Sequence, residues 1–162
     1  MVPIKLLFFV FIPLDINNQS RYSQKMVFSF DKKTFYKSLQ YLVLLIGIHQ
    51  LIYLISYGTL YGFSNLTLRS HCVSFIASTT ITILAEEILY RGFLFHLLVE
   101  RLVSIKKAAI IVAILFGIAH YQFGIMFILY AIITSLIFTK LYLNTGSIIY
   151  PVLIHGLLNI YL

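Results

Sequence analysis

The chain has 162 residues, 60% of them hydrophobic, and a mean hydropathy of +0.96. Only 10% are charged, against about 25% in an ordinary soluble domain, and a soluble fold of this size could not bury so much apolar surface. The formal net charge is +7, but the basic residues sit between apolar segments, which argues against a nucleic-acid partner. The composition therefore predicts a one-domain membrane protein, surrounded by lipids.

The N-terminal part of the chain consists of an apolar stretch followed by a polar one. Residues 1–14 are apolar, but they are fewer than the roughly 20 residues needed to span a bilayer. We expect them to lie at the membrane interface. Residues 15–37 are polar and carry five basic residues. Together, residues 1–37 are predicted to be an interfacial and cytoplasmic segment.

Apolar stretches of helical length follow, separated by short polar segments. The single cysteine, Cys72, begins one of them and excludes an intrachain disulfide. The segment 140–146 contains the turn signal Asn144-Thr145-Gly146. The pattern predicts an all-α, polytopic integral membrane helix bundle of about five transmembrane helices, forming a domain over residues 38–162. The expected helices are residues 38–57, 72–99, 108–121, 125–139 and 147–162.

The loops between these helices differ in basic charge. Residues 15–37, 100–107 and 140–146 carry five, three and one basic residues, whereas 58–71 and 122–124 carry one and none. The two sets alternate along the chain, so all three richer segments can lie on the cytoplasmic side. We therefore expect a plasma-membrane protein with a cytoplasmic N-terminus.

Ionisable residues interrupt the helix expected over residues 72–99. Glu86 and Glu87 are adjacent, and Arg91 follows four residues after Glu87. Each charge near a bilayer centre costs about 2.5–3.5 kcal/mol, so such residues are usually functional. Glu87 and Arg91 can pair on one helix face, but Glu86 points about 100° away and needs another partner or water.

Three further polar residues are predicted to reach the depth of Glu86. With the loop-derived orientation, Glu86 and His120 both lie about 20 Å from the cytoplasmic side. His155 and Asn159 share one face of the last helix, at about 14 and 20 Å. These four residues can therefore meet in one layer of the bundle.

Such a layer supports two kinds of hydrolytic chemistry. A carboxylate beside an imidazole can hold and deprotonate a water molecule, while a second imidazole and a carboxamide can donate to an oxyanion. Alternatively, Glu86, His120 and His155 could bind a zinc ion with an open position for water. Both schemes end in cleavage of a peptide bond inside the membrane.

Three motifs resemble those of the CPBP family of intramembrane proteases, which includes type II CAAX prenyl endopeptidases and bacteriocin-processing and immunity proteins of the Abi type. Glu86-Glu87-Ile88-Leu89-Tyr90-Arg91 resembles E-E-x-x-x-R. Phe116-Gly117-Ile118-Ala119-His120 resembles F-x-x-x-H. His155-Gly156-Leu157-Leu158-Asn159 resembles H-x-x-x-N. The resemblance places a protease core at about residues 72–162.

The resemblance implies an endopeptidase that acts on membrane-associated peptides or proteins. Glu86 would activate water with His120, and Glu87 and Arg91 would orient the site. His155 would stabilise the oxyanion together with Asn159. The family is described both as a metalloprotease and as a glutamate-type protease, and the sequence leaves zinc as an alternative.

Two other functions compete with proteolysis. The first is a self-immunity or interaction protein that protects its host from a membrane-active bacteriocin, with or without cleavage. The second is a small transporter whose buried charges form an ion pathway. The absence of a repeated pair of broken helices from the sequence argues against a transporter. His49 and His96 fit no motif and are expected to serve structural ends.

Overall fold

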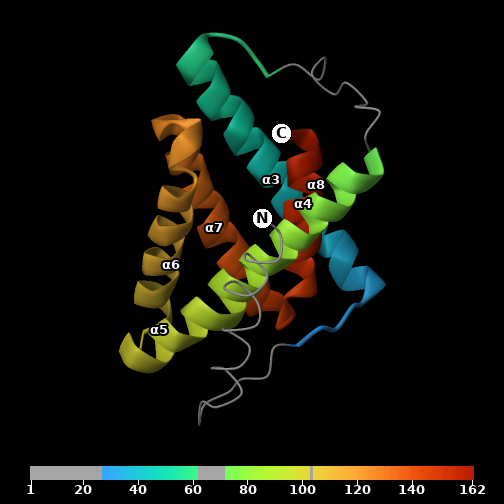
Figure 1. The fold of residues 1–162 in the computed structure, drawn as a ribbon, viewed down its shortest axis with the longest axis vertical. Coiled ribbons are helices and arrows are strands. Elements are labelled where there is room, and N and C mark those ends of the chain that lie inside the picture. The colour runs from blue at the N-terminus through green and yellow to red at the C-terminus, as the bar shows by residue number, and fades with distance from the viewer. Residues whose placement is uncertain (1–26, 62–71, 103) are drawn as a thin grey trace.

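The computed structural model describes residues 27–61, 72–102 and 104–162, without the side chains of 72–79 and 102. Residues 1–26 of the expected N-terminal segment 1–37, including the stretch 1–14 expected at the membrane interface, lie outside it. The described residues form helices and contain no strand, which confirms the all-α prediction (Figure 1). Two of the helices are not α-helical: η3 is a π-helix and η4 is a 3₁₀ turn. The elements are α3 (Lys32–Tyr57), α4 (Cys72–Glu87), η3 (Ile88–Leu94), α5 (Phe95–Leu102), α6 (Ile105–Ala119), η4 (Tyr121–Phe123), α7 (Ile125–Thr145) and α8 (Ile149–Tyr161).

Helix α3 begins six residues before the predicted start. The Asp31 carboxylate caps the helix by accepting hydrogen bonds from the Thr34 backbone N–H and hydroxyl, each at 2.7 Å. The lysines of the first two turns are exposed, so they are compatible with a helix although their charge predicted a polar segment. The helix ends at Tyr57, as predicted, because Gly58 adopts a left-handed conformation with φ of 71°.

The second predicted helix is continuous, but its middle part is π-helical rather than α-helical. Elements α4, η3 and α5 run without a break from Cys72 to Leu102, three residues beyond the predicted end. The π-helical stretch starts directly after Glu87, and its wider turn is completed by the Phe95 N–H bonding to the Tyr90 carbonyl. π-Helical turns occur frequently at functional sites.

Two predicted loops are largely helical. Residues 100–107 were expected to be a loop, but α5 extends to Leu102 and α6 begins at Ile105 after a Ser104 cap. Residues 140–146 were also expected to be a loop, but α7 continues to Thr145 and ends at Gly146, which has φ of 67°. Both errors arise because exposed lysines and arginines near helix ends resemble loop residues in sequence.

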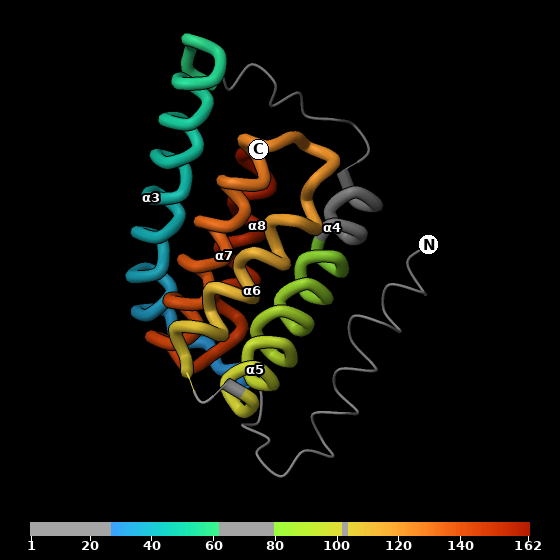
Figure 2. The backbone as a smooth tube through the Cα atoms, turned by 90° about the vertical axis from the view of Figure 1, so that its left-hand side faces the viewer, coloured from blue at the N-terminus to red at the C-terminus, as the bar shows by residue number. Residues whose placement is uncertain are grey.

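Helices α6 and α7 are antiparallel neighbours that pack closely. Gly117 makes this possible, since a Cβ atom there would collide with the side chain of Ile132 and lie 3.0 Å from the Ile128 carbonyl. In Figure 2, α3 stands at one side of the bundle and α4 at the other, with α6, α7 and α8 between them. Helix α3 packs on α7 and α8, while α4 packs on α8.

Two helices, α3 and α7, are long and apolar enough to cross a membrane. Their outward faces and that of α6 expose large apolar side chains, as lipid-facing surfaces do. Spanning by the other expected helices remains a prediction. Exposed apolar residues on these three helices include Val43, Leu51, Ile55, Ile110, Ile114, Ile118, Met126, Leu129 and Leu136.

Basic residues gather at one end of the bundle. The start of α3, the α5–α6 connection and the end of α7 lie at the same end (Figure 2). These segments carry the basic residues that the sequence analysis placed on one side of the membrane, and the fold brings them to one end of the bundle. The orientation of this end in a membrane remains a prediction. The exposed basic residues concerned are Lys32, Lys33, Lys37, Arg101, Lys106, Lys107 and Lys140.

Candidate functional site

Glu87 and Arg91 form a completely buried pair where α4 passes into η3. Both side chains have 0% exposure. Arg91 Nη1 donates a hydrogen bond of 3.3 Å to Glu87 Oε1. Arg91 Nε also lies 3.3 Å from Glu87 Oε2, but without hydrogen-bond alignment, so these two atoms remain unsatisfied. Burying a single charge in this place would be costly, and each residue compensates the other.

Arg91 also connects η3 to α7. Its Nη2 atom donates to the Ser135 hydroxyl at 2.9 Å and to the Ser135 carbonyl at 3.1 Å. The guanidinium carbon lies 5.0 Å from the ring centroid of Phe116 and 5.4 Å from that of Phe138. Aromatic faces attract a desolvated cation. The arginine is therefore held by a carboxylate, a serine and two rings from three helices.

His155 of α8 lies between the two glutamates. Its Nδ1 atom is 2.8 Å from Glu87 Oε1, and its Nε2 atom is 4.0 Å from Glu86 Oε2. An ionised carboxylate can only accept, so Nδ1 carries the proton and donates to Glu87. The same Phe138 ring that faces Arg91 packs on the imidazole at 5.2 Å. His155 thereby presents Nε2 toward Glu86.

Glu86 is the less buried of the two glutamates. Its side chain is 23% exposed, whereas that of Glu87 is 0% exposed. The Oε2 atom of Glu86 is the carboxylate oxygen that lies 4.0 Å from Nε2 of His155. Among the carboxylates of this cluster, Glu86 is therefore the one that an incoming molecule can reach.

His120 ends α6 with its imidazole fixed by the helix itself. Its Nδ1 atom lies 2.7 Å from the carbonyl oxygen of Phe116, one turn earlier. A carbonyl accepts only, so Nδ1 donates and the neutral ring keeps an unprotonated Nε2. The Phe116 ring packs against the imidazole with centroids 4.6 Å apart. The Phe116 ring also packs on the Arg91 guanidinium. The phenylalanine of the F-x-x-x-H motif thus contacts Arg91 and also orients the histidine of the motif.

Asn159 takes no part in the hydrogen bonds of this cluster in the described part of the chain. It lies one turn after His155 on α8, where it is partly buried. Within the described part of the chain it forms no hydrogen bond with the other five predicted residues. The structure thus brings together Glu86, Glu87, Arg91 and His155 directly. His120 adjoins them through the Phe116 ring, which packs on both imidazoles, and Asn159 lies one turn further along α8.

The sequence analysis missed Ser135 and Phe138. Both lie on α7, which carries no motif, and both are completely buried against Arg91 or His155. The only sequence signal was a run of hydroxyl residues in an apolar helix, at Thr134, Ser135 and Thr139. Such residues often join helices in membranes, so the signal was present but did not point to a site.

The two remaining described histidines lie away from the cluster, as expected. His96 Nε2 is 2.7 Å from the Tyr142 hydroxyl, which links α5 to α7. His49 of α3 is buried among tyrosine rings, and its Nδ1 atom lies 3.2 Å from the Tyr161 hydroxyl. Both imidazoles serve packing between helices.

The structure does not group the three candidate zinc ligands closely around one point. The donor chemistry of Glu86, His120 and His155 would suit zinc. Among the described residues, however, no three histidine, cysteine, aspartate or glutamate side chains are grouped closely enough to hold an ion. His120 and His155 each donate Nδ1–H to a protein acceptor, which leaves Nε2 of both rings directed elsewhere, and His155 Nε2 stands 4.0 Å from Glu86 Oε2.

Comparison with known proteins gives a match to a family model. The model described as type II CAAX prenyl endopeptidase Rce1-like matches residues 67–161, which is more than half of the chain and includes all six predicted site residues. Searches of the curated proteins and of the solved structures give no match.

Proposed function

Because the chain belongs to the Rce1-like family of type II CAAX prenyl endopeptidases, we propose that it hydrolyses peptide bonds of membrane-associated substrates with water activated by Glu86 and His120. The family indicates a membrane protease. The substrate class follows from the family description: a peptide whose prenylated cysteine precedes its last three residues.

The difference between the two glutamates carries this proposal. Glu87 is closed off by Arg91 and His155, whereas Glu86 is partly exposed and lies 4.0 Å from Nε2 of His155. A general base must be reachable by the proton that it removes. Glu86 meets this requirement, and Glu87 is suited to positioning its neighbours.

The reaction begins with a water molecule between Glu86 and His120. One water proton is hydrogen-bonded to the free Nε2 of His120, and Glu86 removes the other as the water oxygen attacks the peptide carbonyl carbon. The carbonyl oxygen becomes an oxyanion in the tetrahedral intermediate. Collapse of the intermediate breaks the C–N bond, and the proton held by Glu86 passes to the leaving nitrogen. The products are a carboxylic acid and an amine.

We propose that His155 stabilises the oxyanion. With Glu86 and Glu87 ionised, the two glutamates and Arg91 carry a net charge of −1, so an imidazolium at His155 neutralises the cluster. The protonated ring donates Nδ1–H to Glu87 and presents Nε2–H to the oxyanion. Asn159, one turn further along α8, is proposed to donate a second hydrogen bond when substrate is bound.

The proposed activity can be tested with the full chain in lipid vesicles. The probe is a peptide that ends in a farnesylated cysteine followed by three residues, and mass spectrometry detects release of the tripeptide. We expect wild-type protein to release it and His120→Ala to be inactive. His96→Ala removes a partly buried imidazole outside the cluster and is the matched control, expected to retain activity. Absence of cleavage by wild type, or equal cleavage by His120→Ala, would contradict the proposal.

A further inference from the structure

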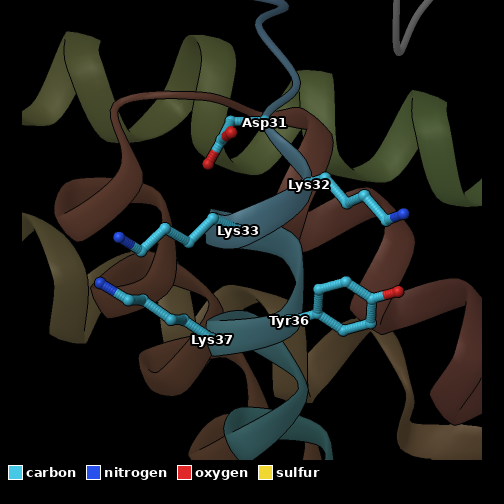
Figure 3. A pocket seen from close by; sticks show the side chains of 5 residues that line it. All are labelled: Asp31, Lys32, Lys33, Tyr36 and Lys37. Carbon is cyan, nitrogen blue, oxygen red and sulfur yellow. The ribbon is translucent and has the colours of Figure 1, made fainter.

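A basic surface at the start of α3 has no role in the proposed reaction. Asp31, Lys32, Lys33, Tyr36 and Lys37 line an open surface pocket of about 650 Å³. Lys33 and Lys37 are one helical turn apart and point the same way, while Lys32 and Tyr36 extend on the other side of the helix (Figure 3). Two ammonium groups, those of Lys33 and Lys37, therefore stand together on one side of the helix, and that of Lys32 stands beside Tyr36 on the other.

The charges of this surface are not neutralised by the protein. No ion pair joins the three lysines to a carboxylate in the described part of the chain. Asp31 is the acidic group in the pocket, and hydrogen bonds from Thr34 lower the pKa of its carboxyl below the usual range, so it stays ionised. It already serves as the cap of α3. With three lysines and the one ionised Asp31, the surface has a net charge of +2.

Exposed aromatic side chains accompany these lysines. Phe28 and Phe30 precede the helix and are 54% and 59% exposed, and Tyr36 is 59% exposed. Helix α3 itself is apolar and long enough to cross a membrane. Aromatic residues next to the end of a spanning helix are characteristic of the lipid headgroup region. The basic surface thus lies where the apolar helix meets the membrane surface.

The segment before α3 is hydrogen-bonded to the first turn of α8 and to the residues just before it. The Ser29 N–H donates to the Ser147 hydroxyl at 3.1 Å, and that hydroxyl donates to the Ser29 carbonyl at 2.8 Å. The Asp31 N–H donates to the Tyr150 hydroxyl at 2.8 Å. The basic surface is therefore held against the helix that carries His155, and a ligand bound there would stabilise packing between α3 and α8.

We propose that this surface binds anionic phospholipids, with Lys33 and Lys37 together binding the phosphate group of one lipid. Lys32 adds positive charge on the other side of the helix, where Tyr36 supplies a hydroxyl donor and a ring for the glycerol region of a neighbouring lipid. Exposed aromatics favour a lipid over free phosphate, because a soluble anion gains nothing from them. This binding site is independent of the proposed peptidase activity, since none of its residues belongs to the cluster around Glu86.

The test uses the purified full chain in neutral detergent, titrated with phosphatidylglycerol, phosphatidylcholine or inorganic phosphate. Thermal unfolding reports binding, since a ligand that binds the folded state raises Tm. The variant Lys33→Gln/Lys37→Gln keeps helix propensity and length. The matched control, Lys106→Gln/Lys107→Gln, removes two exposed lysines of α6 at the same end of the bundle.

Phosphatidylglycerol is expected to raise the Tm of wild type and of the α6 control alike. The Lys33→Gln/Lys37→Gln variant should need an about 30-fold higher concentration of this lipid for the same rise in Tm. Each lysine near an anionic surface increases the affinity about five- to sixfold, and the variant lacks two of them. Equal responses of both variants would overturn the proposal, as would equal stabilisation by phosphatidylcholine. If saturating inorganic phosphate abolished the rise in Tm caused by phosphatidylglycerol, the site would bind a free anion instead of a lipid.

Discussion

Nδ1 of His155 lies 2.8 Å from Oε1 of Glu87, although 68 residues separate them in the chain. The same oxygen accepts a hydrogen bond from Arg91 Nη1. One buried carboxylate thus orients both the arginine of its own helix and the imidazole of α8. The neighbouring Glu86 remains partly exposed beside the opposite edge of that imidazole, and it is there that we place the reaction with water.

Removal of Arg91 is expected to destabilise the fold strongly. Arg91→Met leaves the Glu87 charge buried without its partner, which typically costs about 3–5 kcal/mol. The double variant Glu87→Gln/Arg91→Met removes both charges and should recover part of that loss. The measurement is unfolding of the detergent-solubilised protein. Arg101→Met, which removes an exposed arginine of α5, is the control and should unfold like wild type. An Arg91→Met protein as stable as this control would contradict the role of the pair.

Ser135 is expected to position Arg91 rather than to react. Ser135→Ala removes the hydroxyl that accepts from Nη2 but keeps the backbone carbonyl, and losing a hydrogen bond to a charged group costs about 1.5–3 kcal/mol. We expect lower stability together with a reduced kcat. Thr139→Val removes a nearby hydroxyl that donates to the Ser135 carbonyl without touching Arg91. If both variants lost kcat to the same extent, Ser135 would have no specific link to the site.

Gly117 is expected to tolerate no side chain. Gly117→Ala places a methyl group against Ile132 and the Ile128 carbonyl, and such overpacking costs about 1–3 kcal/mol. The double variant Gly117→Ala/Ile132→Ala should be closer to wild type, because the second change makes room. Gly47→Ala is the control, since nothing lies within 4 Å of a Cβ there. Equal thermal stability of the Gly117 and Gly47 variants would refute this view of the α6–α7 contact.

The sequence was sufficient to identify the residues of the cluster, but not which of them are buried and which are exposed. Buried charges in an apolar chain are costly, so Glu86, Glu87 and Arg91 stand out from composition and spacing alone. The predicted depth of the polar residues then added His120, His155 and Asn159, and the resemblance to a protease family gave each of them a role. Which glutamate is closed off depends on packing between distant helices, and residue spacing does not determine that.

The sequence-based helix boundaries were less accurate where charge was used to locate loops. Arg101 and Lys140 were assigned to loops, but both lie on helices whose exposed sides reach solvent at the basic end. The end of α3 was predicted correctly because Gly58 is a strong local signal. The π-helical stretch after Glu87 could not be predicted, since no residue pattern distinguishes it from an α-helix.

Removal of metal ions is expected to leave peptidase activity unchanged. Glu86, His120 and His155 are not grouped as metal ligands in this structure, and the proposed reaction uses only their proton-transfer and hydrogen-bonding groups. Activity should therefore be the same before and after treatment with 1,10-phenanthroline, and purified active protein should contain no stoichiometric zinc. Loss of activity on chelation with recovery on adding zinc would show that the site takes up a metal.

The central claim is that Glu86 is the base that activates water. The most direct measurement is the single-turnover rate of tripeptide release by Glu86→Gln, with thermal unfolding recorded on the same sample. Because a general base contributes about 10²–10⁴-fold, we predict a rate decrease of that size at an unchanged Tm. Glu100→Gln, an exposed glutamate of α5, should have the wild-type rate. A Glu86→Gln protein that cleaves within about threefold of wild type would contradict the claim, since a carboxamide cannot take up the proton.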